Sequence, residues 1–293
     1  MTHVCRLSLL FLLLLSACQP AAQTEAAPIL ATNTVLADIA RHVTGDTAAV
    51  GSLLPPGADP HEYQATPADV RNIAQSRILI VNGLEYEHFL ESLMESAGGE
   101  RLVITASEGL PARPASEGDA ALDPHLWLDP QYVIGYVENL CAGLTSAHPE
   151  NAEAYRRNAE AYTAELQALD AWIASRVETV PAQNRLLVTN HASLGYFAER
   201  YGFTIVAHIL PGAGSGASPR DLAAAVDRVR DTGAPAVFLG RLENPDLALQ
   251  LAAETGVRVV DDLYLETLSE GPPAGSYLDM MRHNTDRIVE ALR

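Results

Sequence analysis

Three histidines stand in loop-like contexts rather than on the face of a helix. His61 and His125 each follow an Asp-Pro pair, and His191 directly follows a short apolar run. Proline fixes the backbone ahead of the first two rings. The carboxylate of the pair, Asp59 or Asp123, can orient its imidazole by a hydrogen bond. Three neutral imidazoles and one carboxylate form a donor set that suits a tetrahedral divalent metal, so the pattern predicts a metal site.

The elements that would position these histidines are short β-rich runs alternating with helical patterns. Strands are predicted at 29–32, 50–53, 78–81 and 102–105, and again at 186–189, 204–208, 236–239 and 257–260. Strand–helix alternation predicts an α/β protein with two lobes, each a four-stranded, mainly parallel sheet flanked by helices. Since ligands bind outside the carboxyl ends of parallel strands, all three histidines should face one cleft between the lobes.

A helix with one apolar stripe is predicted to join the two lobes. Apolar residues recur every three or four positions through residues 149–181, with Pro149 before the stripe and Pro181 after it. A coiled coil would need further repeats, so a single long rigid helix is the better interpretation. The expected organisation is an N-terminal α/β lobe at 28–148, the linking helix at 149–181 and a C-terminal α/β lobe at 182–293.

The first residues have the layout of an export signal. Arg6 precedes an apolar run that is shorter than the roughly 20 residues of a membrane-spanning helix, and the run ends in Leu-Ser-Ala before Cys18. We expect a signal peptide at 1–17, lipidation of Cys18 and a lipidated tether at 18–27. An ordinary cleaved signal peptide is the alternative. Cys141 is then the one free thiol left in the mature chain, so an internal disulfide is excluded. It is expected to be a buried small hydrophobic residue.

The composition excludes several functions. Among 293 residues, 37 acidic residues oppose 19 basic ones, all arginine, for a formal net charge of −18. Without lysine there is no Schiff-base chemistry and no phosphate-loop lysine. An acidic chain without a basic block is also a poor binder of nucleic acid.

Four stretches of the chain resemble the zinc/manganese-binding lipoproteins of bacterial ABC uptake systems. They are Gly57-Ala58-Asp59-Pro60-His61-Glu62-Tyr63, Asp123-Pro124-His125-Leu126-Trp127-Leu128-Asp129-Pro130, His191 ahead of Gly195-Tyr196-Phe197, and Tyr277-Leu278-Asp279-Met280-Met281-Arg282-His283-Asn284. The resemblance covers essentially the whole mature chain. It implies two four-stranded α/β lobes joined by a long helix, with a metal held between them by histidines and carboxylates.

The resemblance also implies the ligand set. His61, His125 and His191 match the histidine positions. Glu266 matches the position at which relatives usually have an aspartate, while Asp261 and Asp262 are weaker candidates. His208, at a strand end, is the main rival but lacks the Asp-Pro context. The chain departs from many relatives at Ala192, where they have an aspartate, and at Gly240, where an acid is common and Glu243 comes slightly later.

The expected function is that of an extracytoplasmic, lipid-anchored, monomeric receptor that delivers a divalent metal ion to a membrane ABC permease. Three imidazoles favour Zn²⁺ over Mn²⁺, which prefers oxygen ligands; a manganese or iron receptor of the same class is the alternative. A zinc metallohydrolase would need an open coordination position, so four protein ligands argue for a binding protein that is no enzyme. Binding needs neutral imidazoles, so affinity should fall below their usual pKa of about 6.5.

Overall fold

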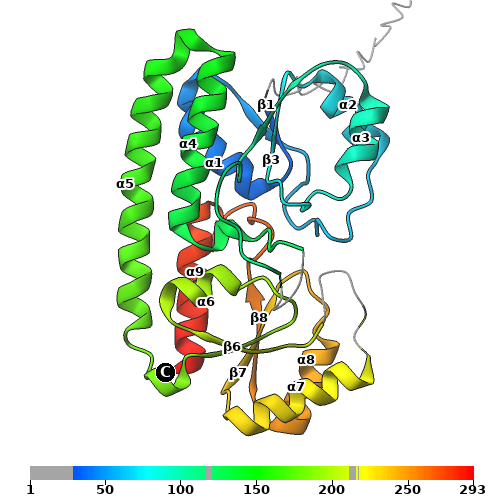
Figure 1. The fold of residues 1–293 in the computed structure, drawn as a ribbon, viewed down its shortest axis with the longest axis vertical. Coiled ribbons are helices and arrows are strands. Elements are labelled where there is room, and N and C mark those ends of the chain that lie inside the picture. Colours follow the sequence, from blue (N-terminus) through cyan, green and yellow to red (C-terminus); the bar gives the residue numbers. More distant parts are fainter. Residues whose placement is uncertain (1–28, 116–120, 211–215, 217) are drawn as a thin grey trace, which may run out of the picture.

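The computed structural model describes residues 29–115, 121–210, 216 and 218–293. It contains two four-stranded sheets, both entirely parallel (Figure 1). The first has the order β2-β1-β3-β4 and the second the matching order β6-β5-β7-β8. The strands are β1 (Ile29–Ala31), β2 (Val50–Ser52), β3 (Ile78–Val81), β4 (Leu102–Thr105), β5 (Leu186–Thr189), β6 (Thr204–His208), β7 (Ala236–Gly240) and β8 (Arg258–Leu263). The predicted fold class is therefore confirmed.

Helices cover both faces of each sheet. They are α1 (Thr34–Thr44), α2 (Pro67–Gln75), α3 (Leu90–Ala97), α4 (Pro130–Ala147), α5 (Ala152–Val177), α6 (Gly195–Tyr201), α7 (Pro219–Thr232), α8 (Asp246–Thr255) and α9 (Tyr277–Leu292). Single 3₁₀ turns occur at Gly45–Thr47, Leu126–Leu128, Pro149–Asn151 and Ala182–Asn184. Three of the four inner strands, β1, β3 and β7, are buried along their whole length, as strands covered on both faces should be.

Two helix starts show how the sequence fixes its elements. Thr66 and Ser218 each accept a hydrogen bond from the backbone N–H three residues on, and Asp69 and Asp221 return the contact. Proline occupies the first helical position after each cap, where its missing N–H costs nothing. These capping boxes begin α2 and α7 with residue types that the sequence itself supplies.

The long helix α5 spans 26 residues and runs beside both lobes (Figure 1). It is shorter than the predicted 149–181, because a 3₁₀ turn at Pro149–Asn151 precedes it and the chain leaves the helix before Pro181. Its apolar stripe, from Tyr155 to Val177, packs against α1, α4 and α9 of the same chain.

One hydrophobic core continues through both lobes along this helical layer. It joins residues of β1 and β3 with residues of α4, α5, β7 and α9. Two smaller cores lie under the outer helices, one beneath α2 and α3 and the other beneath α7 and α8. The lobes are thus connected by shared packing as well as by the chain.

One sequence expectation is wrong in part, and another falls outside the described residues. Cys141 is half-buried against the main core rather than fully buried. The predicted signal peptide, Cys18 and the tether lie outside the described residues. Within the part of the chain that is described, no helix is long and apolar enough to cross a membrane.

Candidate metal centre

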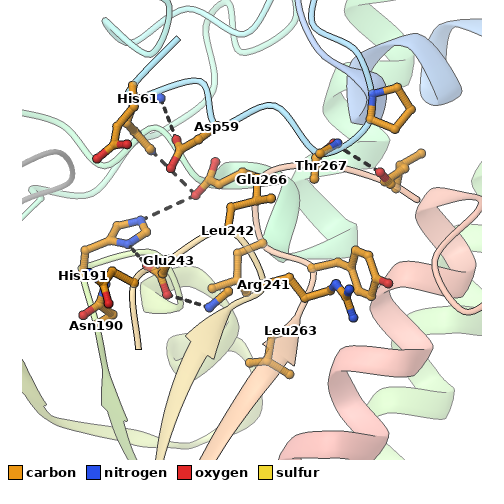
Figure 2. Close-up of a pocket in the computed structure, with 18 of the residues that line it drawn as sticks. Asp59, His61, Asn190, His191, Arg241, Leu242, Glu243, Leu263, Glu266 and Thr267 are labelled. Atoms are coloured by element: carbon orange, nitrogen blue, oxygen red, sulfur yellow. Dashed lines mark hydrogen bonds and ion pairs between the residues drawn. The ribbon is translucent and has the colours of Figure 1, made fainter. Parts of the chain in front are cut away.

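The three histidines and Glu266 meet at the carboxyl ends of the two sheets. His61 lies in the loop after β2, His125 lies in the connection between β4 and α4, and His191 follows β5 directly. Glu266 comes three residues after the end of β8. Figure 2 shows His61, His191 and Glu266 converging from their separate loops. The common cleft expected from parallel-sheet topology is present.

The four side chains point one atom each at a shared centre. Oε1 of Glu266 lies 3.7 Å from Nε2 of His61, 3.1 Å from Nε2 of His125 and 3.5 Å from Nε2 of His191. All four atoms lie within 4.8 Å of one another. Each of them is buried and has no hydrogen-bond partner in the structure. Buried polar atoms are normally paired, so four unpaired atoms facing one point indicate a site for a cation.

The other nitrogen of His125 is fixed by Asp123. Oδ1 of Asp123 lies 2.7 Å from Nδ1 and also accepts a hydrogen bond from the His125 backbone N–H. A carboxylate on Nδ1 places the proton there and leaves Nε2 free as a metal ligand. Asp59 behaves differently, because its Oδ1 accepts from the backbone N–H of His61 and not from the ring.

We expect Asp123→Asn to weaken metal binding by about tenfold, because the amide keeps the shape but loses the charge that makes His125 a strong donor. Competition with a fluorescent chelator would measure the affinity. The matched control is Asp262→Asn, since Asp262 pairs with Arg287 at 2.8 Å and is not one of the converging groups. Equal affinities for Asp123→Asn and the unchanged chain would contradict this role.

His191 is oriented by a carboxylate that the sequence analysis did not assign to it. Oε1 of Glu243 makes a very short contact with Nδ1 of His191, and Oε2 of Glu243 accepts a 2.6 Å hydrogen bond from the Gly240 backbone N–H (Figure 2). Glu243 lies three residues after Gly240, the last residue of β7. Its position shortly after β7 was the one feature of the sequence that could have indicated the contact between Glu243 and His191.

Glu266 is oriented by Tyr86, whose hydroxyl donates to Oε2 at 3.0 Å. Tyr86 and Glu266 are both buried, and burial together with the facing carboxylate raises the pKa of Tyr86 well above its usual value. The phenol therefore remains a hydrogen-bond donor. This contact leaves Oε1 as the oxygen that faces the three imidazoles.

The electrostatics of the site favour protons on His125 and His191 when no metal is bound. Burial lowers the pKa of His125, but Glu266 and Asp123 outweigh burial and raise that pKa to about 10. Burial likewise lowers the pKa of His191, and the facing carboxylates of Glu243 and Glu266 raise it to about 9. Burial raises the pKa of Glu266, but the facing imidazoles hold it well below its usual range. A metal ion must therefore displace protons to bind.

A cavity of about 780 Å³ opens onto the site between the lobes. His61, His191 and Glu266 line its wall, whereas His125 does not. His125 is only 3% exposed and lies at the inner end of the cluster. An ion entering through the cavity would thus meet His61, His191 and Glu266 before it reached His125.

The rejected candidates lie elsewhere. Nδ1 of His208 is 2.7 Å from the Thr189 hydroxyl, and this histidine is not among the converging groups. Asp261 is exposed, and Asp262 forms its ion pair with Arg287. In the described part of the chain, one group of histidine, cysteine or acidic side chains can hold a metal, and its members are His61, His125, His191 and Glu266.

Comparison with known proteins agrees with this arrangement. The family model described as zinc-uptake complex component A, periplasmic, matches residues 29–291. The manganese-binding lipoprotein MntA of Halalkalibacterium halodurans is 32% identical over 269 residues, which cover 92% of this chain and 89% of that protein. The manganese-bound periplasmic metal-binding protein from Candidatus Liberibacter asiaticus has a TM-score of 0.83 at 28% identity and covers 90% of this chain and 99% of its own. The periplasmic zinc-binding protein TroA from Treponema pallidum has the same TM-score and identity, covering 90% and 98%.

These similarities confirm the resemblance drawn from the sequence motifs. The relatives are extracytoplasmic substrate-binding proteins of ABC transporters, which makes this chain a metal-binding receptor and no enzyme. Their names differ in the metal, which is manganese for some and zinc for TroA. The match over nearly the whole described chain shows that the protein belongs to the family of zinc-uptake complex component A, the periplasmic metal-binding components of ABC transporters.

Proposed function

We propose that the chain captures one divalent transition-metal ion, with a preference for zinc, and delivers it to a membrane ABC permease. His61, His125, His191 and Glu266 would be the ligands. The observation that carries the proposal is the convergence of four buried side-chain atoms that have no hydrogen-bond partner of their own. Because leaving such atoms unpaired is costly, a bound cation is the simplest way to satisfy all four.

The distances within the cluster support zinc. A tetrahedron with metal–ligand bonds of about 2.0–2.1 Å has edges of about 3.3–3.4 Å. The three distances from Oε1 of Glu266 to the imidazole nitrogens, 3.1, 3.5 and 3.7 Å, fall around this value. Tyr86 occupies Oε2, which favours a carboxylate that binds through one oxygen and gives four ligands in all. Manganese usually takes more oxygen ligands than this set offers.

Further parts of the proposal concern the chain outside the site. We propose that Cys18 carries a lipid anchor, that residues 18–27 form the tether and that the receptor acts as a monomer. The N-terminal lobe would comprise 28–148 and the C-terminal lobe 182–293, with the segment 149–181 between them. Four protein ligands leave no open position for a reactive water, which fits a carried ion rather than a catalytic one.

Titration calorimetry on the purified, metal-stripped chain would test the proposal. We expect one zinc ion per chain and an affinity for zinc at least about tenfold higher than for manganese. His191→Ala should weaken zinc binding at least about tenfold, since even outer partners of metal ligands contribute that much.

His208→Ala is the matched control, because His208 also ends a strand beside His191 but lies outside the cluster. Its affinity should equal that of the unchanged chain. Tight manganese binding with exclusion of zinc would overturn the choice of metal. An unchanged affinity in His191→Ala would remove that residue from the ligand set.

A further inference from the structure

The segment that carries Glu266 belongs by sequence to the C-terminal half, yet its hydrogen bonds run to the N-terminal lobe. The indole Nε1 of Trp127 donates to the backbone oxygen of Leu265 at 2.8 Å. Tyr86 donates to Glu266 itself at 3.0 Å. Trp127 and Tyr86 both precede α5 in the chain and pack in the main core. The ligand is therefore held from the side of the lobe that supplies His61 and His125.

Thr267 extends this connection. Its Oγ1 accepts a hydrogen bond from the backbone N–H of Gly57 at 3.2 Å, which Figure 2 shows beside the site. The same oxygen lies 3.1 Å from Oγ1 of Thr34, the first residue of α1. Thr34 in turn accepts from the backbone N–H of Leu268 at 2.8 Å. Thr267 and Thr34 are 6% and 7% exposed, so these bonds are shielded from water.

His191 is held within its own lobe. Its Nδ1 contacts Glu243, and its backbone oxygen accepts from the hydroxyl of Thr189 at 2.8 Å. Tyr196, five residues further along the chain, makes a hydrogen-bonded contact between the lobes: its hydroxyl donates to the Asp123 backbone oxygen and accepts from the N–H of Arg113. Tyr196 lies on α6, and this contact reaches the backbone of Asp123 rather than His191.

We propose that Thr267 is a positioning residue that keeps Glu266 on the N-terminal lobe. Three ligands, His61, His125 and Glu266, then stay together, and His191 is the ligand that separates when the metal is released. This inference rests on the proposed function as a metal receptor. In sequence, two ligands precede α5 and two follow it. In the proposed release step, by contrast, three ligands stay with the N-terminal lobe and one leaves with the C-terminal lobe.

The test compares Thr267→Val with Thr267→Ser in a zinc-dissociation experiment. Valine keeps the shape without the hydroxyl, whereas serine keeps the hydroxyl. With an excess chelator trapping released zinc in stopped flow, Thr267→Val should release the ion about fivefold faster, the factor given by one average hydrogen bond. Thr267→Ser should stay within about twofold of the unchanged chain. Equal rates for Thr267→Val and the unchanged chain, or a serine variant as fast as the valine variant, would overturn the proposal.

Thr285→Val is the control for a general loss of stability. Thr285 is fully buried in α9, and its hydroxyl bonds only to the Met281 backbone oxygen of the same helix at 2.7 Å. This variant should unfold at a lower temperature yet release zinc at the normal rate. Faster release from Thr285→Val to the same extent as from Thr267→Val would mean that the hydroxyl of Thr267 has no specific role.

A second measurement does not depend on metal binding. In the metal-free chain, hydrogen exchange of the Leu268 amide should be about fivefold faster in Thr267→Val, with exchange at 187–194 unchanged. Unchanged exchange at Leu268 would overturn the proposed anchoring even if zinc binds as expected. If no metal binds but Leu268 still responds, the proposed function fails while the anchoring of the Glu266 segment stands.

Discussion

Glu266→Gln is expected to weaken zinc binding by at least about hundredfold. Glutamine has the same shape and can still accept the hydrogen bond from Tyr86, but it presents a neutral oxygen or an N–H group to the metal. Mutation of a residue that only hydrogen-bonds to a metal ligand typically lowers metal affinity by about 10- to 100-fold. Loss of a direct anionic ligand should therefore lower the affinity by about 100-fold or more. Calorimetric titration of the metal-stripped variant would measure the change.

Glu270→Gln is the matched control for this substitution. Glu270 lines the same cavity four residues further on and is exposed, so the change removes the same charge without removing a converging atom. Its affinity should be nearly unchanged at physiological ionic strength, where exposed charges are screened. If both variants lost affinity equally, the general acidity of the cavity would explain binding and the coordinating role of Glu266 would be refuted.

Zinc affinity is expected to rise by at least about hundredfold from pH 6 to pH 8, the gain from one displaced proton. In the metal-free site, the neighbouring carboxylates raise the pKa of His125 to about 10 and that of His191 to about 9. Each displaced proton gives about a tenfold gain in affinity per pH unit below the pKa of the group that loses it. The pH range of proton competition thus lies above the usual imidazole value of about 6.5 that the sequence analysis used.

Calorimetry in buffers of different ionisation enthalpy would count the protons released per zinc ion bound. At least one proton is expected at pH 7, because at least one imidazole is charged in the metal-free chain. The stability of that metal-free chain should change in the opposite direction. Imidazoles with raised pKa values stabilise the folded state below pH 6.5, and this contribution is lost as the pH rises through 9 and 10. A pH-independent affinity with no proton release would contradict this account.

The sequence was sufficient for the parts of the molecule that depend on local patterns. The strand before His191 is a short apolar run, and the capping boxes at Thr66 and Ser218 contain their own start signal. Because parallel strands present their carboxyl ends at one edge of a sheet, the positions of the three histidines after predicted strands were enough to predict that they share one cleft. Local patterns did not identify Glu266 as the fourth ligand. Only the motif resemblance distinguished it from the neighbouring acids Asp261 and Asp262.

Contacts between distant parts of the chain could not be read from those patterns. Glu243 lies 52 residues from His191, and Tyr86 lies 180 residues from Glu266. Their roles follow from how the two lobes pack, and a buried tyrosine has the same sequence signature as any core aromatic residue. For Asp59 the local pattern predicted a contact that the structure does not contain. Its Asp-Pro context resembles that of Asp123, but its carboxylate accepts from the His61 backbone N–H and not from the imidazole.

The last helix has a consequence for the order in which the fold can be completed. The Tyr277 backbone N–H at the start of α9 donates to the carboxylate of Asp38 in α1, and its hydroxyl donates to the Trp127 backbone oxygen. The C-terminal end of the chain therefore fills a place in the core of the N-terminal half. A chain that emerges N-terminus first cannot close that core until its final residues arrive. A chain that lacks α9 would leave part of that core exposed to water.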